Sequence, residues 1–293
     1  MGVVVRIDAF VPSGVDPAKA FRATFDRVAD LARRLSSYRE DSELRRVERL
    51  AWQGPVQVSE AFGRVLGAAL RLARESGGAF DPTIGAVTRL VRAGPLAADG
   101  HGTGALEAAW RRTGWDRVNL DAERGTVFLR SRRLQLDFGG IAKGFIADEA
   151  IHGLRAFGVR RALVSIAGDI VAGEAPPGRE GWVVGLDAVG AQGSIERRVA
   201  LRHQAVSTSG SRERSYLHNG RRCSHIVTRS SPLCGDMAAA VSVVAPTGME
   251  ADGLATALLA LGQEWSDPLL AGRPGVRAYW AGRRTAVKTD PRP

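Results

Sequence analysis

The order of strand-like and helix-like patterns limits the fold of this 293-residue chain more than any other feature of its sequence. Several strand patterns follow one another without a helix between them, notably between residues 118 and 138. A doubly wound parallel sheet requires regular βαβ alternation, and this chain lacks it. We therefore expect an α+β fold, with mixed or antiparallel sheets flanked by helices, built as a single domain over residues 1–293.

Hydrophobic periodicity places the individual elements along the chain. Strands are expected at residues 3–10, from 118, at 126–129, 134–138, 161–166, 182–186, 241–245, 276–280 and 284–287. Helices are expected at residues 16–35, 59–76, 142–157 and 249–261. Residues 92–104 are predicted to form a flexible connection, residues 36–44 and 79–85 to form loops, and residues 208–210 a turn.

Composition excludes several classes of protein. No stretch approaches 18 consecutive apolar residues, so no membrane span is expected. The two cysteines, Cys223 and Cys234, are too few for a disulfide framework, and their spacing gives no argument for a bridge between them. The residues after Met1 lack the basic start and apolar core of a secretory leader. The expected location is cytoplasmic for the chain as it stands, and outside the cytoplasm if a leader precedes it.

The net charge of +10 raises the question of anionic partners. A nucleic-acid surface combines clustered cations with interleaved aromatic side chains. Here the arginines are scattered along the chain and lack such aromatics. Nucleic-acid binding stays open as an alternative from charge alone, but we expect no nucleic-acid partner.

The segment LDFGGIAKGFIADEA, residues 136–150, is the first candidate for chemistry. Two glycines stand between a predicted strand and a predicted helix, where they let the backbone approach a ligand and leave helix N–H groups for an anion. The segment matches neither a Walker loop nor a dinucleotide fingerprint. A tight turn with packing glycines would explain it equally. Lys143 is the only lysine between Lys19 and Lys288, which favours a phosphate or carboxylate partner.

The segment TGMEADGLATALLALG, residues 247–262, is the second candidate. Thr247 and Glu250 form a capping box, which predicts that a helix begins there. Asp252 and Thr256 are four residues apart and share one face of that helix. A carboxylate beside a hydroxyl is a plausible half-site for Mg²⁺, which prefers oxygen ligands. The alternative is an exposed first-turn aspartate favoured by the helix dipole.

Three further residues have both a functional and a structural interpretation. His225 precedes a strand-like Ile-Val pair and is a candidate general base, because its ordinary pKa lies near neutral pH. A lone histidine is more often structural. Tyr38 is able to stack on an aromatic ligand, and Asp81 before proline favours a turn; each is also compatible with ordinary loop structure.

Taken together and in order, these segments resemble the FAD:protein FMN transferase family, the ApbE family. The resemblance covers nearly the whole chain. It rests on the Met1-Gly2 opening and on the segments SSYREDSEL, AFDPTIGAVTRL, LDFGGIAKGFIADEA, SIAGDI, AVSTSG, SHIV and ADGLATAL. Several of these are weak signals alone, but eight of them in the family's order are specific.

The resemblance implies an enzyme that moves FMN from FAD to a threonine or serine hydroxyl of a target protein and releases AMP. By position, the Asp252 carboxylate, the Thr256 hydroxyl and the Gly140 carbonyl would hold Mg²⁺, and His225 would be the base. The residues that fall where the family contacts FAD are Met1, Tyr38, Phe80, Asp81, Asp137 and Lys143. Attack on a pyrophosphate needs charge neutralisation and a positioned proton acceptor, which this set supplies.

One segment departs from the family pattern. After the histidine the family usually has I-D-P-x-T-G, whereas this chain has residues 226–231 as Ile-Val-Thr-Arg-Ser-Ser. An alternative function is therefore a divergent FAD-binding protein that lacks transfer, or one that hydrolyses FAD to FMN and AMP. Transfer, FAD binding and FAD hydrolysis all require Asp252 and Thr256 to face the glycine turn across a cavity.

Overall fold

A computed structural model describes residues 3–93, 101–187, 195–210, 215–218, 221–224 and 239–282. Every pair of neighbouring strands in its sheets is antiparallel, and helices flank these sheets, which confirms the predicted α+β class. The single domain over residues 1–293 stays a prediction. Among the described residues no helix is both long and apolar enough to cross a bilayer.

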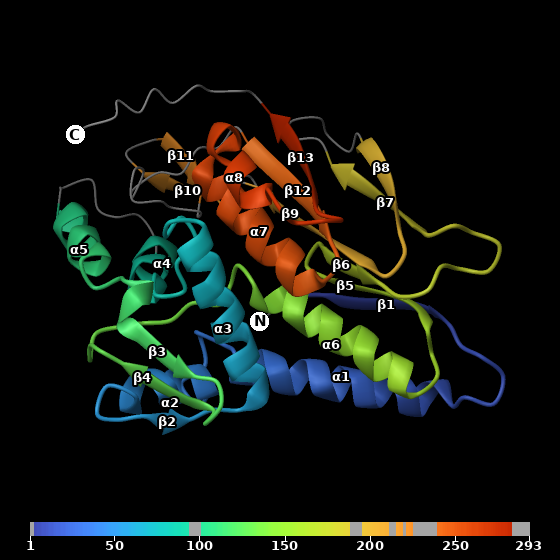
Figure 1. Cartoon of the computed structure of the whole chain (residues 1–293), viewed down its shortest axis with the longest axis horizontal. Coiled ribbons are helices and arrows are strands. Elements are labelled where there is room, and N and C mark those ends of the chain that lie inside the picture. The colour runs from blue at the N-terminus through green and yellow to red at the C-terminus, as the bar shows by residue number, and fades with distance from the viewer. Residues whose placement is uncertain are drawn as a thin grey trace.

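A six-stranded sheet forms the centre of the molecule, with the strand order β1-β5-β6-β9-β12-β13 (Figure 1). Its strands are β1 (Val5–Phe10), β5 (Arg161–Ile166), β6 (Asp169–Ala172), β9 (Gln204–Gly210), β12 (Ala239–Ala245) and β13 (Arg277–Gly282). β5 and β6 form a tight hairpin, because Ala167 and Gly168 both have positive φ angles, of 49° and 93°.

The two faces of this sheet bury different sets of side chains, as period-two alternation requires. Ala205 and Val243 pack into the main core with the helices α1 (Pro17–Arg34), α6 (Ala142–Ala156) and α7 (Gly248–Leu261). Their sequence neighbours Val206 and Val244 pack on the opposite face against the β7 (Trp182–Asp187) and β8 (Ile195–Leu201) ribbon. The sheet is therefore the middle layer of three.

A second unit lies beside this sandwich (Figure 1). It contains the small sheet β2-β4-β3, formed by β2 (Val56–Gln57), β4 (Thr126–Leu129) and β3 (Val118–Asp121). Around it lie α2 (Glu43–Leu50), α3 (Glu60–Glu75), α4 (Gly85–Arg92), α5 (His101–Trp110) and a short 3₁₀ turn at Trp115–Arg117. The remaining elements are the hairpin of β10 (Ser215–His218) and β11 (Arg221–Ser224), the 3₁₀ turn Gln263–Trp265 and α8 (Asp267–Leu270).

Side-chain caps explain why the predicted helices begin where they do. The Asp16 carboxylate accepts from two N–H groups of the first turn of α1, and the Ser59 hydroxyl accepts from Phe62 N at the start of α3. Thr247 accepts from Glu250 N at the start of α7, which confirms the predicted helix start there. Glu250 instead pairs with Arg273, so only half of the capping box forms.

Residues 134–138 do not form the predicted strand. A single parallel bridge joins Gln135 to Ile84, and the N–H groups of Leu136 and Asp137 find partners outside a sheet. Leu136 N donates to the Glu48 carboxylate at 2.6 Å, and Asp137 N donates to Pro82 O at 2.8 Å. Residues 134–138 have an apolar pattern because the segment is buried. Its backbone N–H groups are hydrogen-bonded by a side chain and a loop carbonyl, and not by a neighbouring strand.

Four predictions of loops, connections or turns are also wrong in part. The segments predicted as loops at 36–44 and 79–85 lead directly into α2 and α4, which begin at Glu43 and Gly85. The predicted connection at 92–104 overlaps the end of α4 and the start of α5, and residues 94–100 lie outside the described part. The predicted turn at 208–210 is the end of β9, where Thr208 bonds across the strands to Ser242.

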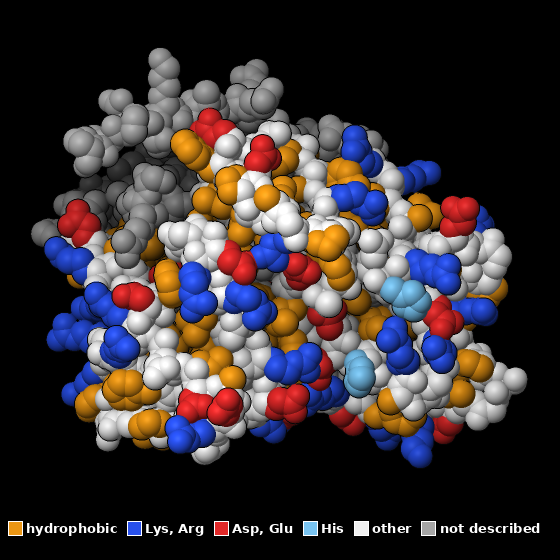
Figure 2. Space-filling view, in the orientation of Figure 1, with side chains coloured by type: hydrophobic (Ala, Val, Ile, Leu, Met, Phe, Trp, Pro, Cys, Tyr) orange, Lys and Arg blue, Asp and Glu red, His pale blue; other side chains and the backbone are white. Residues whose placement is uncertain are grey.

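The bounds of the other predicted helices and strands agree with those in the structure to within a few residues. The strand predicted at 284–287 lies outside the described residues. Cationic and anionic side chains are interspersed on the face shown in Figure 2, with no large area of a single sign. The absence of a nucleic-acid partner stays a prediction.

Candidate active site

A cavity of about 430 Å³ lies where the central sheet, its helices and the second unit meet. Eight of the ten site residues predicted from the sequence line it: Tyr38, Phe80, Asp81, Asp137, Gly140, Lys143, Asp252 and Thr256. They come from segments separated by more than 200 residues of sequence. The expectation that Asp252 and Thr256 share a cavity with the glycine turn is confirmed.

The wall that carries Asp252 depends on direct backbone contact between α6 and α7. A Cβ atom placed on Gly144 would lie 1.9 Å from the carbonyl oxygen of Gly248, and one placed on Gly140 would lie 2.8 Å from the Thr256 hydroxyl oxygen. From α6, Asp148 accepts from the N–H groups of Gly248 and Met249 and so caps α7. The glycines thus bring the turn and the α7 hydroxyl together.

Lys143 and two acidic residues form a buried charged cluster in this wall. Lys143 Nζ lies 3.1 Å from Asp252 Oδ1 and 2.5 Å from Asp169 Oδ2. Asp169 also accepts from the Ser207 hydroxyl, and Asp252 Oδ2 accepts from Gly144 N at 3.1 Å. Asp252 is therefore buried and paired inside α7, which excludes the alternative of an exposed first-turn aspartate.

The pKa values in this cluster reflect the balance of burial and pairing. Burial by itself lowers the pKa of Lys143, but the charges of Asp252 and Asp169 outweigh it and hold that pKa above its ordinary value. Burial and the charge of Asp252 raise the pKa of Asp169 to about 7, against the opposing effect of Lys143. The cluster thus has one lysine charge facing two carboxylates in the wall of the cavity.

The oxygen atoms in this wall fit a small hard cation. The Asp252 carboxylate, the Thr256 hydroxyl and the backbone of Gly140 are neighbours, and Ser209 Oγ lies 3.4 Å from Thr256 Oγ1. Carboxylate, hydroxyl and carbonyl oxygens are the donors that Mg²⁺ accepts while keeping places for water or phosphate. Within the described residues no group of three histidine, cysteine or acidic side chains provides a competing metal site.

Asp137 organises the opposite wall. Its Oδ1 accepts from Gly139 N at 2.7 Å, and its Oδ2 accepts from the Thr88 hydroxyl at 2.7 Å and lies 3.2 Å from Arg92. The Asp137 side chain is buried, so these contacts fix the glycine turn against α4. Nearby, Asp81 Oδ1 accepts from the N–H and the hydroxyl of Thr83, as the predicted turn requires.

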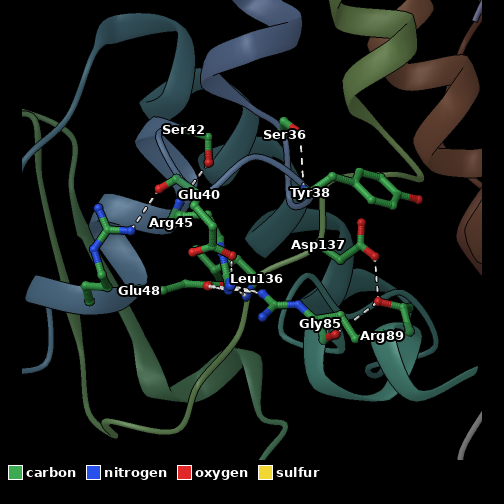
Figure 3. A network of polar contacts seen from close by, with 12 residues as sticks. Ser36, Tyr38, Glu40, Ser42, Arg45, Glu48, Gly85, Arg89, Leu136 and Asp137 are labelled. Atoms are coloured by element: carbon green, nitrogen blue, oxygen red, sulfur yellow. Dashed lines mark hydrogen bonds and ion pairs between the residues drawn. The ribbon is translucent and has the colours of Figure 1, made fainter. Parts of the chain in front are cut away.

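Behind this wall, Glu48 joins α2, α4 and the segment that leads to the glycine turn (Figure 3). Its carboxylate accepts from Leu136 N and Arg45 at 2.6 Å each, and from Arg89 at 3.1 Å. Sequence analysis missed this residue, because a glutamate in a charged stretch is usually solvated. Its one local partner, Arg45, forms an ordinary i, i+3 helix pair, and the partners that reveal its role lie 41 and 88 residues away.

Replacing Glu48 by glutamine is expected to lower the free energy of unfolding by about 2–3 kcal/mol, because two partly buried arginines lose the buried carboxylate that they share. Urea unfolding followed by circular dichroism measures the change. Glu40→Gln is the matched control, since it removes an exposed partner of the same Arg45. The unfolding midpoint of the control should match that of the unchanged chain. Equal midpoints for both variants would contradict the structural role of Glu48.

Two predicted site residues, Met1 and His225, lie outside the described residues, as does Cys234. For the eight residues in the cavity, contact with FAD or with a metal stays a prediction. Arg92 and Asp169 also line the cavity, although sequence analysis gave them no role. The SIAGDI segment was the one signal for Asp169, whereas nothing local marked Arg92.

Comparisons with known proteins identify the family of the chain. The family model described as the ApbE family matches residues 1–280. The FAD:protein FMN transferase of Treponema pallidum is 36% identical over 286 residues, which cover 90% of this chain and 78% of the relative. The protein of the same name from Klebsiella pneumoniae is 31% identical over 281 residues, with 90% and 77% covered.

Solved structures show the same fold. The flavinyl transferase ApbE of Pseudomonas stutzeri in its apo form superposes with a TM-score of 0.78 at 29% identity, over 97% of this chain and 92% of that one. The flavin transferase ApbE of Vibrio cholerae superposes with a TM-score of 0.82 at 24% identity, over 96% and 94%. The motif order, the fold and the match over residues 1–280 agree, and the chain belongs to the ApbE family.

Proposed function

We propose that the chain transfers the FMN part of FAD to a threonine or serine hydroxyl of a target protein and releases AMP. The observation that carries this proposal is the cavity of about 430 Å³, in which oxygens of Asp252 and Thr256 face a glycine turn and Lys143 lies beside them. The names of the curated relatives support the choice of FAD as donor and of a protein as acceptor.

The reaction balances without a further reactant. The acceptor oxygen bonds to the phosphorus on the FMN side of the pyrophosphate, and the bond from that phosphorus to the bridging oxygen breaks. AMP carries away the electron pair of that bond, and the hydroxyl proton passes to a base. We propose His225 as that base, because the resemblance places it at the family's histidine and the ordinary pKa of histidine lies near neutral pH. A positioned base contributes about 10²–10⁴ in rate.

Asp252, Thr256 and the Gly140 carbonyl would hold Mg²⁺ in this cavity. The ion would supply charge neutralisation at the pyrophosphate. Lys143 already lies within reach of Asp252 and adds a fixed positive charge to the same wall.

Incubation with FAD, MgCl₂ and a protein known to accept FMN is expected to give a covalently fluorescent acceptor band on a denaturing gel, together with AMP. Excess EDTA should abolish both products, and added MgCl₂ should restore them. A band that forms equally well after exhaustive metal removal would contradict the metal role. Absence of the band with several acceptors, although FAD binds, would contradict transfer.

Hydrolysis of FAD to FMN and AMP is the second candidate. The observation that favours it is the altered segment after His225, which replaces the family's usual I-D-P-x-T-G. In this case AMP should appear without any protein acceptor, at a rate that an added acceptor does not change. AMP release that depends strictly on the acceptor would exclude hydrolysis as the main reaction.

A further inference from the structure

An exposed aromatic ring is held in a fixed place at the cavity wall. The Tyr38 residue is 60% exposed, yet its backbone N–H donates to the hydroxyl of the buried Ser36 at 3.2 Å (Figure 3). The Arg92 guanidinium carbon lies 5.1 Å from the centre of the Tyr38 ring. Both residues line the cavity, so the chain maintains a large aromatic surface there without burying it.

The Arg92 side chain is itself anchored. It ends α4, and its terminal nitrogen lies 3.2 Å from Asp137 Oδ2, on a carboxylate that Thr88 and Gly139 already fix. A guanidinium held at one edge by a carboxylate presents a flat face to an aromatic ring. The chain therefore connects the glycine turn, α4 and the Tyr38 ring through a single arginine.

We propose that Arg92 is a positioning residue for FAD, acting through Tyr38. It fixes the tyrosine ring so that a flat heteroaromatic ring of the ligand stacks against it inside the cavity. This inference rests on the proposed function, since FAD supplies the flat rings. The favoured geometry of such stacks requires the protein ring to be oriented before the ligand arrives, and an exposed tyrosine without Arg92 would rotate freely.

The first test compares FAD affinity by titration of flavin fluorescence. Arg92→Ala is expected to raise the Kd for FAD roughly 3- to 30-fold and to reduce the shift in the visible absorption of bound flavin. Arg132→Ala is the matched control, because Arg132 lies 5.2 Å from the Trp52 ring in a similar pair that does not line the cavity. The control should leave both the Kd and the absorption shift unchanged.

Arg92→Lys separates charge from shape. Lysine is able to keep the ion pair with Asp137 but has no flat face, so its Kd should fall between those of Arg92→Ala and the unchanged chain. A double-mutant cycle with Tyr38→Leu tests the route of action. If Arg92 acts through Tyr38, the two substitutions together should weaken binding no more than Tyr38→Leu alone.

Two fragments of FAD identify the ring that stacks on Tyr38. If it is the isoalloxazine, Arg92→Ala should weaken FMN binding and leave ADP binding unchanged; if it is the adenine, the reverse should hold. Either result supports the proposal. An unchanged Kd and spectrum for Arg92→Ala, or fully additive effects in the cycle, would overturn it. Failure of the proposed function is a separate result: a chain that binds FAD without transferring FMN would contradict transfer, and the Arg92 comparison of FAD binding would still support or overturn this proposal.

Discussion

Asp252→Asn should lower the rate of flavin transfer by about 10²–10³-fold, since it removes the one carboxylate among the proposed metal ligands. The substitution keeps the shape of the side chain, and the amide oxygen still accepts from Gly144 N. Lys143 keeps Asp169 as its partner, so the fold should survive. The measurement is the initial rate of covalent flavin incorporation at saturating FAD over a range of Mg²⁺ concentrations. The variant should also need more Mg²⁺ for half of its own maximal rate.

Asp267→Asn provides the control for this experiment. It is the same chemical change at an exposed position near the start of α8, away from the cavity. Its rate and Mg²⁺ requirement should match those of the unchanged chain. Were Asp252→Asn to keep both the rate and the Mg²⁺ requirement, the assignment of Asp252 as a metal ligand would be wrong.

Gly144→Ala should have the largest effect on stability. The added Cβ would lie 1.9 Å from a backbone oxygen of Gly248 and 2.9 Å from Asp252 Cβ, so no side-chain rotation relieves the clash. The helices α6 and α7 must separate, which loosens a closely packed core and displaces Asp252. We expect a loss of about 3–5 kcal/mol in the free energy of unfolding, measured by urea titration.

Gly63→Ala is the matched control, because Gly63 lies inside α3 and a Cβ there meets nothing within 4 Å. Alanine at an open helical position should stabilise the fold by about 0.5–1 kcal/mol. The two substitutions are identical in chemistry and opposite in expected sign. A Gly144→Ala variant as stable as the unchanged chain would show that α6 and α7 do not touch as described.

Local signals predicted the elements that have local causes. The helices capped by Asp16, Ser59 and Thr247 begin where the sequence predicts, because a cap and its helix are adjacent in the chain. The segment at 134–138 was misassigned because its backbone partners, Glu48 and Pro82, lie far away in sequence. The short helices α2 and α4 were missed because eight residues give too little periodicity to exceed the loop signals beside them.

The site residues divide in the same way, into those that belong to a local motif and those whose partners lie far away in the sequence. Gly140, Lys143, Asp252 and Thr256 belong to two contiguous motifs, and the motif order sufficed to predict that they share a cavity. Glu48 and Arg92 belong to no motif. Each acts by joining segments that only the folded chain brings together, Glu48 across 88 residues and Arg92 across 45 and 54. Sequence spacing carries no trace of such couplings.

The crossing of α6 and α7 also has a consequence for engineering. Where two helices touch through their main chains, a shift of either one disrupts their packing, so Asp252 and Thr256, the proposed cation ligands, leave little room for gradual change. Attempts to make the enzyme accept flavin analogues should therefore vary Tyr38 and Arg92 at the cavity wall. The small residues that hold the two helices together should be left untouched.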